Sequence, residues 1–222
     1  MDFDSAKPVL DALAAPVQGL DTAQLVALAA ALGFASGIRL YAVLLITGLA
    51  GYAGWVDLPA GLHLLQHPAF LAVSALLMGV EFFADKIPLV DSAWDAVHTF
   101  IRIPAGAALA AAVFGADQAT FAAIAALVGG TLAATSHAAK ATTRAAANTS
   151  PEPFSNVALS LAGDMAVPAL LWLAVEHPVW FFIALAIALV VAIVLIRLLW
   201  KFLRAVVNRI EHLFTGDLSH GS

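Results

Sequence analysis

The chain alternates long apolar segments with short breaks that are rich in proline, glycine and charged residues. A helix that crosses a membrane needs about 20 apolar residues, and several of these segments reach that length. The pattern therefore predicts an all-α, polytopic membrane helix bundle. We expect about six spans, near residues 21–51, 68–87, 104–114 with part of the segment before it, 118–148, 154–175 and 178–204.

The segment DSAWDAVHTFIR differs from the spans because its apolar residues recur at helical spacing between polar ones. Trp94, Val97 and Ile101 share one face, and Asp95 and Arg102 lie on others. We therefore expect an amphipathic or re-entrant segment near residues 91–103, lying in the membrane interface or dipping into it.

Composition agrees with a membrane protein and excludes several other classes. Hydrophobic residues make up 62% of the chain and charged residues 11%, which rules out an ordinary soluble domain. The absence of cysteine excludes disulfides and thiolate chemistry. The net charge of −5 points to no nucleic-acid partner, and no cofactor signature is present. The predicted organisation is an acidic cytoplasmic tail (1–20), one transmembrane domain (21–206) and a polar tail (207–222).

The basic residues predict an orientation, because cytoplasmic loops of membrane proteins are enriched in lysine and arginine. With six spans, the segments 52–67, 115–117 and 176–178 share one side and contain neither residue. Apart from Arg39, the basic residues of the predicted transmembrane region and its C-terminal flank then fall on the other side. This sorting predicts that both termini are cytoplasmic.

The two halves of the transmembrane domain, about residues 21–116 and 117–206, resemble each other. Each has a glycine- and alanine-rich span with basic residues, a span with an acid, and a third apolar segment. Three spans per half would make the repeat inverted, which is a common plan among transporters.

Acidic residues inside apolar segments are the first candidates for function, because charge is costly in a bilayer. Glu81 and Asp85 are four residues apart and share a helix face, and Asp164 lies within the fifth predicted span. These carboxylates could bind a cation or a proton, with Arg39 and Lys140 as counter-charges. Alternatively, Asp85 pairs with Arg102 and Asp164 with Arg39 in purely structural ion pairs.

A second set of residues suits an anion. Arg39 follows the small residues of ASGIRLY, and its guanidinium suits a carboxylate or phosphate. His137, Lys140 and Arg144 form a stripe at helical spacing, and the polar loop from Asn148 to Asn156 follows. These residues are possible headgroup or anion contacts, although a basic helix end and an ordinary turn are equally simple readings.

A weaker metal hypothesis rests on the amphipathic segment. Asp91, Asp95 and His98 lie at helical spacing and offer the oxygen and nitrogen atoms that divalent metals bind. No established metal-binding motif accompanies them.

Three motifs carry a resemblance to a known family: ASGIRLY (35–41), EFFADKIP with DSAWDAVHTFIR and PAG (81–106), and NTSPEPFSN (148–156). They resemble an uncharacterised bacterial integral-membrane family known as a domain of unknown function, over about residues 22–205. The resemblance implies a small multi-pass protein of the bacterial inner membrane and implies no activity.

Two shorter resemblances suggest mechanisms. The segment from Glu81 to Lys86 is similar to the acidic motif of small inverted-repeat cation exchangers, with one extra residue and no glycine. The segment from Leu161 to Leu170 is similar to motifs of intramembrane aspartyl proteases, in which Asp85 and Asp164 would activate water.

The function that these features predict first is transport of a small ion or solute. Its most specific form is a proton-coupled cation carrier that uses the carboxylates inside the spans. The alternatives are a lipid-handling protein that binds a phosphate headgroup and a non-transporting membrane scaffold. Enzyme activity stays an open question, with no catalytic residue assigned. The expected partners are the lipid bilayer, a small ion or solute and, through small-residue helix faces, a second copy in a homodimer.

Overall fold

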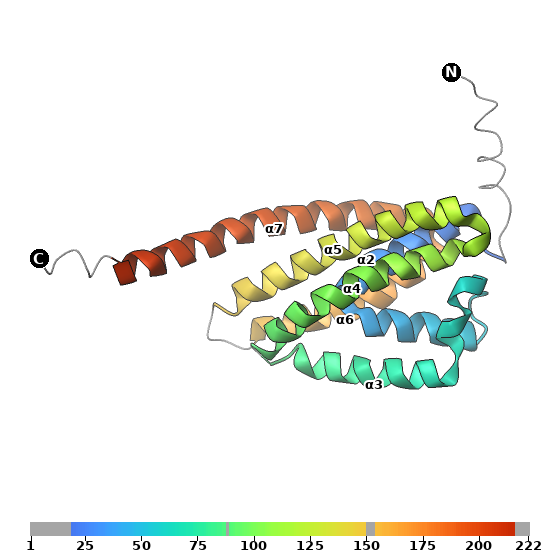
Figure 1. Cartoon of the computed structure of the whole chain (residues 1–222), viewed down its shortest axis with the longest axis horizontal. Coiled ribbons are helices and arrows are strands. Elements are labelled where there is room, and N and C mark those ends of the chain that lie inside the picture. Colours follow the sequence, from blue (N-terminus) through green and yellow to red (C-terminus); the bar gives the residue numbers. More distant parts are fainter. Residues whose placement is uncertain (1–18, 88, 150–153, 216–222) are drawn as a thin grey trace, which may run out of the picture.

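A computed structural model describes residues 19–87, 89–149 and 154–215. These residues form a bundle of α-helices with two short 3-10 segments and no strand, which confirms the all-α polytopic prediction (Figure 1). The elements are α2 (Thr22–Tyr52), η2 (Ala60–Gln66), α3 (Pro68–Ala84), α4 (Val90–Phe114), η3 (Ala116–Gln118), α5 (Ala119–Ala147), α6 (Phe154–Glu176) and α7 (Pro178–Thr215).

By length and composition alone, five helices in the described residues, α2 among them, could cross a membrane, and η2 with α3, bent by 69°, would make a sixth. The segment near 91–103 does not lie apart as an interfacial helix. It is the first half of α4, which continues through Pro104 to Phe114. Its polar side chains are buried in the bundle because they pair with charges on neighbouring helices, so the segment has a polar and an apolar face but is part of a longer helix.

The helix α2 is broken at Arg39, whose backbone is extended (φ −148°, ψ 89°). The chain turns back there, and the two ends of α2 lie at the same end of the bundle (Figure 1). Close contacts agree with this course. Gly37 lies against Ser136 of α5, whereas Gly48 lies against Leu65 and Gly19 against Asp57. The predicted first span is therefore a helical hairpin, and its 31 residues are too few for two crossings.

This hairpin changes the predicted topology. The start of α2 lies at the same end of the bundle as the segments 53–67 and 115–118, and α7 ends at the opposite end (Figure 1). The described part of the chain thus begins and ends at opposite ends of the bundle. The prediction that both termini lie on one side assumed that α2 is one straight span, and it stays a prediction because α2 turns back at Arg39.

The core is built around α2, which supplies more of the buried apolar residues than any other element. Its glycines allow close helix contact: a Cβ on Gly33 would lie 2.6 Å from the Cα of Gly129, and a Cβ on Gly37 would lie 2.0 Å from Ser136 Oγ. In contrast, α3 lies at the edge of the bundle (Figure 1).

The predicted repeat halves do not pack equivalently. The second helix of each half, α3 or α6, packs mainly against α2, although an inverted repeat would place α3 against α5. The inverted repeat therefore stays a prediction. The predicted N-terminal tail lies outside the described residues except for 19–20, and Pro88 and residues 150–153 also lie outside them. The predicted C-terminal tail begins within α7, which continues to Thr215.

Candidate functional site

The charged side chains predicted inside the membrane gather where α3, α5 and the first arm of α2 end and α4 and α6 begin. Among the described residues, this cluster holds five carboxylates and five basic side chains joined by ion pairs. Its members are Glu81, Asp85, Asp91, Asp95 and Asp164 with Arg39, Lys86, Arg102, Lys140 and Arg144. We call these ten residues the charge cluster.

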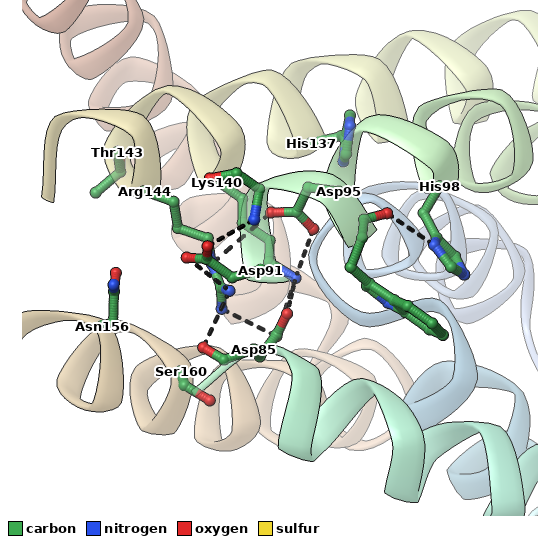
Figure 2. Close-up of polar contacts among 12 residues, drawn as sticks. Asp85, Asp91, Asp95, His98, His137, Lys140, Thr143, Arg144, Asn156 and Ser160 are labelled. Atoms are coloured by element: carbon green, nitrogen blue, oxygen red, sulfur yellow. Dashed lines mark hydrogen bonds and ion pairs between the residues drawn. The ribbon is translucent and has the colours of Figure 1, made fainter. Parts of the chain in front are cut away.

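Asp85 is the centre of the charge cluster. Its carboxylate lies 3.0 Å from Arg39 Nη1, 3.1 Å from Lys140 Nζ and 2.9 Å from Arg144 Nη2. It directly follows α3, and α5 presents Lys140 and Arg144 one turn apart toward it (Figure 2). The residue is fully buried, so three cations surround one carboxylate away from water.

Arg39 enters the charge cluster from the turn of α2. Its Nε lies 2.7 Å from Asp164 Oδ1, and its Nη2 donates to Ser160 Oγ at 2.8 Å. Since only 1% of Arg39 is exposed, these partners and Asp85 replace its hydration shell. The turn in α2 is what allows one guanidinium to reach both α3 and α6. The predicted pairing of Arg39 with Asp164 is therefore observed, together with a second carboxylate.

Arg102 forms a second buried centre of the charge cluster, which Asp95 links to Lys140. Its Nη2 lies 2.5 Å from Glu81 Oε1, and its Nη1 lies 2.7 Å from Asp95 Oδ1. Sequence reasoning proposed Asp85 as its partner, but Glu81 is the residue that faces α4 from inside α3. Glu81 and Asp85 share a helix face and still serve different cations, so they form no paired carboxylate site.

The remaining predicted polar residues extend the charge cluster along α4 and α5. Lys140 also lies 3.3 Å from Asp95, and Arg144 lies 3.6 Å from Asp91. Asn148 donates to Asp91 and accepts from Asn156, which joins the start of α6 to the same network. Figure 2 shows Asp85, Asp91 and Asp95 converging toward the two basic residues of α5.

The two buried histidines do not form a metal site with the nearby acids. His98 Nε2 lies 3.1 Å from the hydroxyl of Tyr41, and its Nδ1 lies 2.8 Å from the carbonyl of Trp94. His137 lies against Thr99. No three histidine, aspartate or glutamate side chains in the described residues are arranged to hold a metal ion. Asp91, Asp95 and His98 are thus placed on one helix without converging.

A cavity of about 520 Å³ opens beside the charge cluster, between α2, α5, α6 and α7. Arg39, Lys140, Arg144 and Asp85 line one part of it together with three hydroxyl groups. The rest of its wall is apolar and consists largely of alanine and leucine from α6 and α7. The charged lining contains three cations and one carboxylate, so the cavity presents an excess of positive charge.

Several contacts in and around the charge cluster had no signal in the sequence. Ser160 binds Arg39 and also lies 3.2 Å from Lys86 Nζ. Lys86 also lies over the ring of Phe82. A serine in an alanine-rich helix has no distinguishing pattern, and the apolar wall of the cavity looks like any membrane span.

Comparison with known proteins places the chain in a family without adding an activity. No curated protein matches it, and no solved structure does. One family model matches residues 26–198, which include the whole charge cluster and the cavity wall. The chain therefore belongs to the family described as "Domain of unknown function (DUF4126)".

Proposed function

We propose that this membrane protein binds an anionic amphiphile, with the acidic head beside Arg39, Lys140 and Arg144 and the chain along the apolar wall of the cavity. The observation that carries the proposal is the lining of that cavity: three cations and one carboxylate in one part, and an apolar wall elsewhere. A lipid with a phosphate or carboxylate head likewise has one charged part and one long apolar part. The role would be lipid handling in the membrane.

The charge balance favours an anion over the cation-carrier hypothesis. A cation site needs carboxylate oxygens that are free to coordinate, but each carboxylate of the charge cluster lies against at least one basic side chain. A cation entering the cavity would meet three positive side chains around Asp85. An anion there would instead be attracted by groups that are already desolvated, where charge-assisted hydrogen bonds are strongest.

Arginine suits this role because its planar guanidinium presents several donors to a phosphate or carboxylate. Asp85, Asp164 and Ser160 hold the donors of Arg39 in place. We infer that the acids of the charge cluster hold the buried basic side chains in place and orient them. The ligand head then shares these basic side chains with Asp85.

We also propose that the charge cluster faces the cytoplasm of a bacterial inner membrane. The charge cluster contains Lys86, Lys140 and Arg144, and α7, whose C-terminal part carries Lys201 and Arg204, ends at the same end of the bundle (Figure 1). The segments at the opposite end within the described residues contain no lysine or arginine. Cytoplasmic segments carry such an excess of basic residues. In this orientation α2 begins outside and α7 ends in the cytoplasm.

The proposal is tested by the thermal stability of the purified protein in detergent with two single-chain lipids of equal chain length. One is lysophosphatidic acid, which carries a phosphate monoester, and the other is zwitterionic lysophosphatidylcholine. A ligand that binds only the folded state raises the unfolding temperature with its concentration. We expect a larger rise with lysophosphatidic acid, and equal rises would contradict the proposal.

Two variants connect that difference to the cavity. Arg144→Gln removes a cation of the lining, so the preference for the acidic lipid should fall, whereas Arg197→Gln on the exposed surface of α7 should leave it unchanged. Ala166→Leu fills part of the cavity at its apolar wall without changing any charge, and it should weaken the binding of both lipids. Stabilisation that survives Ala166→Leu would place the lipid elsewhere.

A further inference from the structure

A second pocket, independent of the charge cluster, lies at the opposite end of the bundle. It has a volume of about 220 Å³ and is enclosed by the two arms of α2, the segment after α2 and the C-terminal half of α6. Leu28, Ile46, Leu58 and Val175 form much of its apolar wall, and Trp55 and Trp172 also line it. Glu176 is its only ionisable lining residue, so this pocket has no basic group to receive an anion.

Thr47 places one buried polar atom in this pocket. Only 4% of the residue is exposed, and its hydroxyl has no hydrogen-bond partner in the described part of the chain. Other helical threonines behave differently: the hydroxyls of Thr99, Thr131, Thr135, Thr142 and Thr143 each donate to the carbonyl four residues earlier. A buried hydroxyl without a partner is unfavourable because it has lost its hydrogen bonds to water, so an acceptor from a ligand would be favourable at this position.

We propose that this pocket binds the ester-linked chain region of a membrane lipid, with the Thr47 hydroxyl donating to the ester carbonyl. The apolar wall suits the chain, and the lack of basic residues excludes a bare acidic head. Tryptophan is enriched where the bilayer meets water, which agrees with Trp55 and Trp172 beside the pocket. Thr47 lies five residues before the end of α2, about 7.5 Å along the helix, which is near the depth of lipid esters.

Trp55 and Trp172 make the pocket directly observable by fluorescence quenching. Trp94, Trp180 and Trp200 are first replaced by phenylalanine, which leaves the two pocket tryptophans of the full chain as the only ones. The protein is then reconstituted in vesicles of unlabelled phosphatidylcholine with traces of brominated phosphatidylcholine. The brominated lipid has either ester-linked chains or ether-linked chains, which lack the carbonyl.

We expect the ester lipid to quench at about a five-fold lower mole fraction than the ether lipid, which is the contribution of one hydrogen bond. Thr47→Val, which keeps the shape of the side chain, should remove this difference, whereas Thr47→Ser should retain it. Ala50→Phe fills the pocket and should reduce quenching by both lipids. Equal quenching by the two lipids, or a difference that persists in Thr47→Val, would overturn the proposal.

The outcome is separable from that of the proposed function. The two reporter tryptophans line this pocket and not the cavity beside Arg39, and zwitterionic phosphatidylcholine does not test the preference for an acidic head. The Thr47 variants leave all ten residues of the charge cluster unchanged. Each site can therefore fail its test while the other passes.

Discussion

The two ends of the bundle differ in which polar groups they bury and in whether these groups have partners. At one end, ten ionisable side chains, seven of them buried and three partly buried, neutralise one another in ion pairs. At the other, acids such as Asp57 and Asp117 stay exposed, and the buried pocket contains a single unpartnered hydroxyl. Both sites border α2 and α6. One helical hairpin thus borders a charged cavity near its turn and a largely apolar pocket between its arms.

The largest expected effect concerns the hairpin itself. Without the turn at Arg39, the two ends of α2 would lie at opposite ends of the bundle. The chain has no cysteine, so single cysteines can be placed freely. We expect Ala23→Cys and Ala53→Cys to react with an impermeant thiol reagent from the same side of the membrane, and Thr149→Cys from the other. Opposite labelling of Ala23→Cys and Ala53→Cys would show that α2 crosses the membrane.

The next largest effect should follow removal of the charge at the turn. Arg39→Gln leaves Asp164 without its closest cation and takes one of three from Asp85. Breaking a buried ion pair from one side is destabilising by about 3–5 kcal/mol. We therefore expect a large loss of folded protein by size-exclusion chromatography and thermal unfolding. Arg197→Gln, on the exposed surface of α7, is the matched control, and an equal effect of both changes would show that the charge cluster is not structural.

A smaller effect should follow changes to the contact between α2 and α5. Gly37→Ala places a Cβ 2.0 Å from Ser136 Oγ and 2.2 Å from the carbonyl oxygen of Ala133. Overpacking of this kind is destabilising by about 1–3 kcal/mol. Gly79→Ala on α3 meets nothing within 4 Å and should be neutral or stabilising. If the thermal unfolding of the two variants is alike, the close approach of the hairpin to α5 is wrong.

The smallest effect is expected among the exposed charges of the other end. Asp117→Asn changes an exposed carboxylate with no ion pair in the described residues, so its unfolding free energy should change by less than about 0.5 kcal/mol. A loss comparable to that of Arg39→Gln would show that the two ends contribute similarly, which would end the contrast between them.

The sequence supported prediction of the helices and the identities of the buried charges, because apolar length and charge in a bilayer are local signals. Arg39, Asp85, Lys140 and Asp164 were predicted together and do lie together. The glycines of the first predicted span, such as Gly37, allowed a break in the helix, but they did not predict that the chain reverses at Arg39. The direction of the chain, and with it the topology, therefore depended on a tertiary contact.

The charged half of α4 shows the same limit. The spacing of Asp91, Asp95 and Arg102 indicated a polar face, but an interfacial helix and a buried ion-pair surface have the same periodicity. The partners decide between them: Arg144 and Lys140 come from α5, far along the chain. Periodicity carries no information about such distant partners.

The central claim, that the charge cluster serves an anionic head, is tested most directly by Asp164→Asn. This change removes a carboxylate that holds Arg39 Nε at 2.7 Å and raises the positive charge beside the cavity. The measurement is the dissociation constant of lysophosphatidic acid for the folded wild-type and variant proteins, with lysophosphatidylcholine as the neutral reference. The account predicts tighter binding of the acidic lipid by the variant and little change for the reference. Weaker binding of the acidic lipid by a folded variant would contradict it.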